Sequence, residues 1–442
     1  MQPGTFWRRL LLIVLCCALA DRLYAGDEFE LPPIRYSQAE PNNAVYRLKQ
    51  QLERGEKSLA YQEKQGYLPA LLAALKISDK SQTLVYSKTS LQTQRISPET
   101  PRAIYFNDNT YIGYCKSGDV IEISTSDNRL GTVFYTLDQR NTEGAKLTRQ
   151  TESCLVCHSS SRTGGVPGHV VRSLFVNPRG QPLYSAGSYS VDHTTPIEQR
   201  WGGWYVTGQH GKQTHLGNLL IKEREVPEPL DNLAGHNVLS VKDRFFTEAY
   251  PTEHSDIVAL MIMEHQALVH NCITKASFET RQSLHYEVEL NRALGDPENK
   301  RQESTTRRIH AAGDALLEAI LMVDEAKLTD PLKGTSGFSE EFVKAGPHDK
   351  QGRSLRDLDM TTRMFKYPCS YLIYSEPFRA LPVEMQEYLW QKLHSVLTYQ
   401  STDTKYEHLS AEDRQAILEI LRDTRESLPS GWKEQLAKGL TP

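Results

Sequence analysis

The stretch "RAIYFNDNTYIGYCKSGDVIEIS" (residues 102–124) decides the fold class, because β-branched and aromatic residues alternate with polar ones between Asn, Asp and Gly breaks. This pattern predicts short β-strands joined by tight turns. The next apolar stretch, "GTVFYTL" (131–137), repeats it. Further on, residues 169–191 predict a hairpin whose turn is at 177–180. We therefore predict a strand-rich first half of the chain.

Helical patterns lie on both sides of these strands. Apolar residues at helical spacing cover 44–77, and Pro69 suits the first turn of a second helix there. Residues 255–276 are apolar nearly all round, which predicts a buried helix with Ser255 or Asp256 as its cap. Further helices are predicted at 309–326, 383–397 and 410–428, the last with Ser410 and Asp413 as an approximate capping box.

The two halves of the chain together predict an α+β protein. A strand-rich region surrounds residues 154–158, and a mainly helical C-terminal half follows it. We divide the chain into a leader at 1–25, N-terminal helices and strands at 26–150, a middle region with strands at 151–250, and a helical region at 251–442.

The first 25 residues have the pattern of a secretory signal. Arg8 and Arg9 precede the apolar run "LLLIVLCCALA" (10–20), which is shorter than the about 20 residues that a membrane span needs. Cleavage after Ala20 or Ala25 would remove Cys16 and Cys17. A retained membrane anchor is the alternative. We expect an exported protein, periplasmic or extracellular, with no membrane span in the mature chain.

The stretch "TESCLVCHSSSRTGG" (151–165) contains the main candidate functional residues. Cys154, Cys157 and His158 form Cys-x-x-Cys-His, the attachment pattern of a c-type haem. Residues three apart on a helical turn project in similar directions, so both thiols can reach the two vinyl groups of one porphyrin. The histidine that follows can then ligate the iron as proximal ligand. We predict one covalently bound haem c.

A cysteine pair at this spacing has three other possible uses. A zinc site would need a second ligand pair at short spacing, and none follows. A thioredoxin-type pair should end a strand and open a helix, whereas both flanks are predicted as loop. A plain disulfide across three residues would be strained. Of the other mature cysteines, Cys115, Cys272 and Cys369, either two form a disulfide or all three remain thiols.

The overall composition excludes one class of partner. The chain has 51 basic and 55 acidic residues, and it contains no basic run with interleaved aromatic residues. A nucleic-acid-binding protein is therefore not expected. With 442 residues and 39% hydrophobic content, the chain is long enough for two or three domains.

The chain resembles a family of large, exported, single-haem c-type cytochrome-domain proteins. The resemblance implies haem binding, with electron transfer as the generic activity, and it implies no substrate. It does not extend to small class I all-α cytochromes c, because strands follow His158 here. It is carried by "CLVCH" together with "SQTLVYSKTS" (81–90), "RISPETPRAIYFND" (95–108), "GTVFYTLDQ" (131–139), "GVPGHVVRS" (165–173), "RWGGWYVTGQHG" (200–211), "SDIVALMIMEHQALVHN" (255–271) and "YPCSYLIYSEPFRALP" (367–382).

The function depends on the other face of the iron. A second protein ligand would favour electron transfer, which we expect, to a redox partner that the sequence does not identify. An open face would favour a haem-dependent oxidoreductase of peroxidase type. A third alternative is a binding or sensor module stabilised by haem or metal. The candidate distal ligands are Met261, His265, His169, His193 and His210; Arg172 and Arg200 are candidate partners of the propionates, and Trp201 and Trp204 are candidate contacts of the ring.

Overall fold

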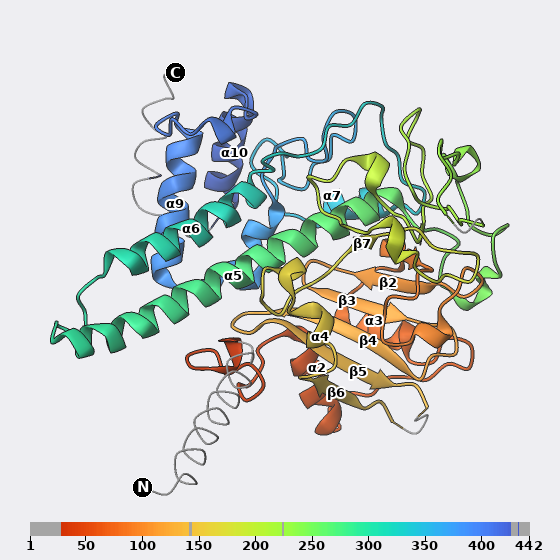
Figure 1. The fold of residues 1–442 in the computed structure, drawn as a ribbon, viewed down its shortest axis with the longest axis horizontal. Helices are drawn as coiled ribbons and strands as arrows, with labels where there is room; N and C mark the ends of the chain where they lie inside the picture. The colour runs from red at the N-terminus through yellow and green to blue at the C-terminus, as the bar shows by residue number, and fades with distance from the viewer. Residues whose placement is uncertain (1–27, 141–143, 223–224, 426–431, 433–442) are drawn as a thin grey trace, which may run out of the picture.

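The computed structural model describes residues 28–140, 144–222, 225–425 and 432. The predicted leader, residues 1–25, lies outside them. The predicted α+β class is confirmed: a seven-stranded antiparallel sheet occupies the N-terminal half, and helices fill the C-terminal half (Figure 1).

The sheet contains the four strands within residues 102–138 that the alternating stretches predicted, and three further strands that they did not predict. Its order is β6-β5-β4-β3-β2-β1-β9, so consecutive strands are neighbours except where β9 returns to the edge beside β1. The strands are β1 (Thr83–Val85), β2 (Arg102–Phe106), β3 (Thr110–Tyr114), β4 (Val120–Asp127), β5 (Gly131–Asp138), β6 (Leu147–Gln150) and β9 (Trp204–Tyr205). The predicted hairpin is a small separate ribbon of β7 (Arg172–Ser173) and β8 (Tyr189–Ser190), with its turn closed by Gly180 N–H donating to the Asn177 carbonyl.

Alternation along the strands gives the sheet two different faces. On the first face Ala103, Tyr105 and Ile112 are buried in one hydrophobic core with the N-terminal helices α2 (Ala44–Glu53) and α3 (Leu68–Leu75). Pro69 lies in the first turn of α3, as predicted. On the second face the register aligns two rows, Phe106–Tyr111–Ser124–Phe134–Gln150 and Ile104–Gly113–Glu122–Thr136–Thr148.

Helix α5 (Ile257–Leu294) runs along the second face of the sheet and begins where the sequence predicted (Figure 1). The Asp256 carboxylate caps it by accepting hydrogen bonds from the Val258 and Ala259 N–H groups. Among the described helices only α5 has the length and apolarity of a membrane span. Because 83% of its most apolar window is buried inside the protein, we assign it to the core.

The C-terminal helices follow α5. They are α6 (Glu303–Ile320), α7 (Phe338–Lys344), α8 (Glu376–Arg379), α9 (Val383–Leu397) and α10 (Ala411–Thr424). Helix α9 has the predicted bounds, and Ser410 with Asp413 forms a complete capping box before α10. The prediction for α6 was wrong at both ends. The helix begins earlier, at the exposed polar residues Glu303 and Ser304, and Met322 takes a positive φ of 57° beyond its end.

Single 3-10 turns connect these elements. They lie at Glu28–Glu30, Asp79–Ser81, Thr93–Arg95, Ser161–Thr163, Tyr184–Ala186, Ile197–Gln199, Leu233–Gly235, Thr247–Ala249, Tyr371–Tyr374 and Thr404–Tyr406.

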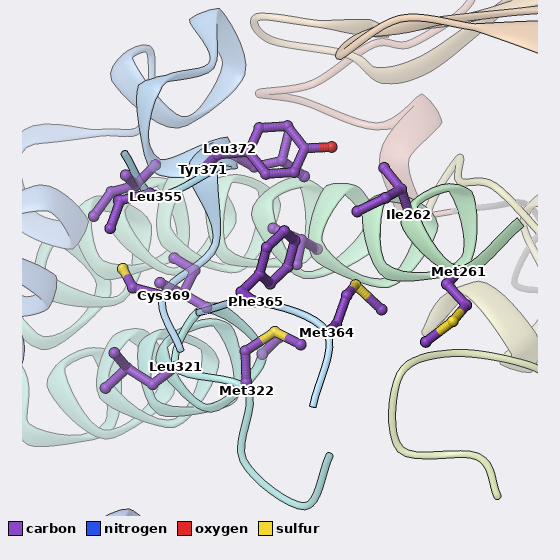
Figure 2. Packing of buried hydrophobic residues seen from close by; sticks show 14 of the residues in the cluster. Met261, Ile262, Leu321, Met322, Leu355, Met364, Phe365, Cys369, Tyr371 and Leu372 are labelled. Carbon is purple, nitrogen blue, oxygen red and sulfur yellow. The ribbon is translucent and has the colours of Figure 1, made fainter. Parts of the chain in front are cut away.

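Two hydrophobic cores hold the described residues together. The first core, which covers the first face of the sheet, also includes Phe134 of the second face and Phe278 of α5. The second core joins α5 and the C-terminal helices to Phe106 and Tyr111 of the sheet; Figure 2 shows part of it, with Met261 on α5 and Met322 and Met364 in the same packed cluster. Both cores therefore draw on the N-terminal and the C-terminal halves of the chain.

Candidate functional site

The Cys-x-x-Cys-His motif forms a single helical turn, α4 (Leu155–His158), which follows β6 at the edge of the sheet. Leu155 is buried in the first core, whereas Val156 is 81% exposed. The prediction of loop on both flanks of the motif was wrong on the N-terminal side, where β6 forms. This strand forms by pairing with β5, so it depends on residues outside the motif. That pairing is antiparallel and α4 ends after one turn, so the described residues around the motif form no βαβ unit of thioredoxin type.

Both motif thiols are free. Cys157 is exposed and Cys154 is half-buried, and burial raises the pKa of the Cys154 thiol. The other described cysteines, Cys115, Cys272 and Cys369, are also unpaired thiols, which matches the second of the two alternatives that the sequence left open.

The imidazole of His158 is held in one orientation. Its Nδ1 lies 2.9 Å from the Gly168 carbonyl oxygen, and the Gly168 N–H donates to the His158 carbonyl at 2.8 Å. Phe134 of the second sheet face lies against the ring, with centroids 5.0 Å apart. Burial lowers the pKa of His158 below 6.5, so the ring is neutral at pH 7. Because a neutral imidazole that donates from Nδ1 has its lone pair on Nε2, this tautomer is ready to ligate iron.

An ion pair lies on the second sheet face near the motif. Arg102 Nη2 and Glu122 Oε2 are 2.8 Å apart, and both charges affect the pKa values of Cys154 and His158. A Cβ at Gly113 would lie 2.2 Å from Arg102 Nη2, so glycine is required for the Arg102 side chain to extend over β3 to Glu122 on β4. Arg102 Nε is buried and has no hydrogen-bond partner among the described residues.

Of the two arginines proposed for the propionates, Arg200 does not fit. It is buried, pairs with Glu264 at 3.0 Å and donates to the carbonyls of Thr195 and His193, so its guanidinium is fully engaged. Arg172 is half-buried and donates to Ser188 Oγ at 2.9 Å, and its buried Nε has no partner in the described part of the chain. Arg172 therefore retains the capacity to bind an anion.

The two tryptophans do not offer a surface to a flat ring. Trp201 and Trp204 are both buried in the second core, and Trp204 Nε1 donates to the Arg172 carbonyl at 2.8 Å. The glycines between them admit other parts of the chain: a Cβ at Gly202 would meet the Leu174 carbonyl at 2.7 Å, and one at Gly203 would meet Ser87 at 2.8 Å.

His169 lies on the wrong side of His158 to be its distal partner. The two nitrogens of an imidazole point in roughly opposite directions, and Gly168, to which His158 Nδ1 is bonded, directly precedes His169. The His169 ring is instead buried against Tyr111, 4.3 Å between centroids, with both nitrogens 3.4 Å from serine hydroxyls of β4.

Three other candidate distal ligands have partners inside the second core. His265 Nδ1 lies 3.0 Å from His193 Nδ1, and His265 Nε2 lies 2.7 Å from Ser370 Oγ. Met261 is buried among apolar side chains of the same core (Figure 2). Burial lowers the pKa of His193 to about 4. These residues stabilise the core around α5, and the structure does not bring them to α4.

The last candidate, His210, belongs to a cluster of three histidines. Its ring lies 4.6 Å from that of His215 and 5.3 Å from that of His236. His210 Nε2 accepts the Asn237 N–H, and His215 Nδ1 accepts the Gly217 N–H. In their neutral forms the other nitrogens then carry protons, so they are donors and not metal ligands. Accordingly, no group of three His, Cys, Asp or Glu residues in the described ranges is arranged to hold a metal ion.

Sequence reasoning missed Gly168, Arg102 and Glu122. The two charged residues carried a signal, because they are polar positions within otherwise apolar strands and alternation places both on one face. Gly168 carried none, since its role depends on the fold of the loop after His158.

The donor set therefore consists of two unpaired thiols on one helical turn and a neutral histidine oriented through Nδ1, which fits covalent haem attachment. Compared with known proteins, the chain matches no protein-family model, no curated protein and no solved structure.

Proposed function

We propose that this protein is an exported c-type cytochrome that holds one haem through Cys154 and Cys157, with His158 as the proximal ligand, and that it transfers electrons. One observation carries the proposal: beside two free thiols, His158 donates Nδ1–H to the Gly168 carbonyl and leaves Nε2 available. Histidines that ligate metals usually make such a bond through their other nitrogen.

Each residue has a defined task in this proposal. Cys154 and Cys157 would hold the haem through two thioethers, each made by adding S–H across a vinyl double bond, which needs no oxidant. His158 presents a neutral Nε2, and Gly168 fixes the direction of the ring. The haem, when bound, supplies one-electron chemistry through its ferric and ferrous states.

The exposure of the motif supports electron transfer. Val156 and Cys157 are exposed at the surface, so the edge of a group bonded to Cys157 would be accessible to a partner protein. Among the described residues, the buried Nε of Arg102 and that of Arg172 each have no partner, so these two arginines are the candidate partners for propionates.

A second candidate function, a haem-dependent oxidoreductase, is favoured by one observation. Each of the five candidate distal ligands either has another partner in the structure or, like His169, lies on the Nδ1 side of the His158 ring. An iron without a distal side chain can bind peroxide or another small ligand.

Attachment is tested by expressing the full chain in a bacterium with a cytochrome c maturation system. The expected product gains the mass of one haem and gives a c-type pyridine haemochrome spectrum. The double variant Cys154→Ala/Cys157→Ala should lose the covalent haem, whereas Cys272→Ala should keep it. A wild-type protein without haem under these conditions would refute the proposal.

The two functions are separated by ligand binding to the purified holoprotein. Electron transfer predicts low-spin spectra in both oxidation states and no response to carbon monoxide or cyanide. A high-spin ferric spectrum, with rapid carbon monoxide binding after reduction, would instead support the oxidoreductase.

A further inference from the structure

Helix α5 holds the loop after the motif by a two-point contact. Asn271 Oδ1 accepts the His169 N–H at 2.8 Å, and Asn271 Nδ2 donates to the His169 carbonyl at 2.8 Å. The side-chain amide thus uses its acceptor and one of its donors on a single residue of the loop. Two bonds from one planar group restrict both the position and the tilt of the backbone that they hold.

The peptide unit that Asn271 holds is the one that orients His158. The His169 N–H and the Gly168 C=O belong to the same planar peptide group and point in opposite directions. Asn271 binds the N–H end at 2.8 Å, and His158 Nδ1 binds the C=O end at 2.9 Å. Fixing one end therefore fixes the other, and the two bonds polarise each other through the peptide.

Close packing leaves this peptide little room to move. A Cβ at Gly168 would lie 2.4 Å from Asn271 Oδ1 and 2.9 Å from Thr163 Cβ, so glycine is required at this position. On α5 the preceding residue, His270, also contacts the sheet region, with Nε2 2.7 Å from the Asp108 carbonyl oxygen. The helix is thus hydrogen-bonded both to the loop, through Asn271, and to the turn between β2 and β3, through His270.

We infer that Asn271 is a positioning residue for the proximal histidine, which it orients through the Gly168–His169 peptide, and that it thereby sets the reduction potential of the haem. This inference rests on the proposed function. A histidine that donates from Nδ1 to a well-held carbonyl is a more basic ligand at Nε2, and a more basic ligand stabilises ferric iron. Loosening the peptide should therefore raise the potential.

The test compares the midpoint potentials of full-length holoproteins carrying Asn271→Ala and Gln282→Ala. Gln282 is a matched control, because it is a buried amide on the same helix that donates to the Glu28 carbonyl, away from the motif. We expect Asn271→Ala to shift the ferric–ferrous equilibrium towards ferrous by roughly three- to tenfold, up to about 59 mV. Gln282→Ala should match the wild type in this measurement.

Asn271→Asp provides a second, milder variant. It keeps the acceptor for the His169 N–H and loses the donor, so its potential should equal or fall below that of the wild type. The inference is overturned if Asn271→Ala keeps the wild-type potential, or if Gln282→Ala shifts it equally. Should Asn271→Ala not fold, a raised potential in Asn271→Asp would overturn the inference. A wild-type protein without haem would refute the proposed function, which is a distinct result.

Discussion

Arg102 and Glu122 are the charged pair whose fields act on both Cys154 and His158, although they lie on strands that precede the motif. Their opposite charges predict opposite effects on a bound haem. Arg102→Gln removes a positive charge and should make reduction of the haem less favourable by roughly 1 kcal/mol, which lowers the midpoint potential by about 40 mV. Glu122→Gln should raise it. Spectroelectrochemical titration of the holoproteins measures both shifts.

Two further variants test whether proximity is the cause. Arg140 is 71% exposed beyond β5, so Arg140→Gln should leave the potential unchanged. Gly113→Ala changes no charge, but its Cβ would displace the Arg102 guanidinium and should lower the potential in the same direction as Arg102→Gln. Equal shifts in Arg102→Gln and Arg140→Gln would contradict this electrostatic explanation.

Among the secondary-structure elements, α5 depends on one carboxylate at its start. Asp256 Oδ1 accepts two N–H groups of α5, and Oδ2 accepts the N–H groups of Thr335 and Ser336. Because the carboxylate is fully buried, Asp256→Ala would leave these donors without partners and should reduce the free energy of unfolding by about 2–4 kcal/mol. Ser410→Ala, which removes the cap of α10, should cost about 1 kcal/mol. Urea denaturation measures both, and equal losses would contradict the prediction.

The helices and strands that could be predicted are those marked by residues within the element itself or directly before it. Helix starts are marked by local chemistry: Pro69 lacks an N–H, and the side chains of Asp256 and Ser410 accept N–H groups of the first turn. Alternation marks β2 to β5. The prediction missed β1, β6 and β9, because these strands have only two to four residues each and form by pairing with their neighbours.

The same distinction applies to the candidate site. The spacing of Cys154, Cys157 and His158 is visible in the sequence, and the structure places them on one turn. The distal ligand could not be predicted from the sequence, because the partner of a buried histidine is set by the tertiary fold. His265 Nε2, for example, is hydrogen-bonded to Ser370 Oγ, which is far away in the chain.

Considered as a whole, the protein buries many histidines in neutral form, and this predicts how its stability depends on pH. Burial lowers the pKa of His270 and His193 to about 4, and it lowers those of His169, His215 and His265 well below 6.5. Burial also raises the pKa of Glu264 and Glu325 to about 7, and these two groups act in the opposite direction. The histidines are more numerous, so their effect should dominate.

As the pH falls from 6.5 towards 4, the unfolded chain takes up protons on these histidines while the folded chain does not. The free energy of unfolding should therefore fall with pH in this window, by about 3 kcal/mol for His270 alone. His270→Gln keeps a donor for the Asp108 carbonyl and removes the titration, so its stability should fall less steeply than that of the wild type. His285→Gln, on the same helix, is the control and should follow the wild type. Urea denaturation at pH 4.5, 5.5 and 6.5 measures all three proteins, and a wild-type stability that rises on acidification would show that the two buried glutamates outweigh the histidines.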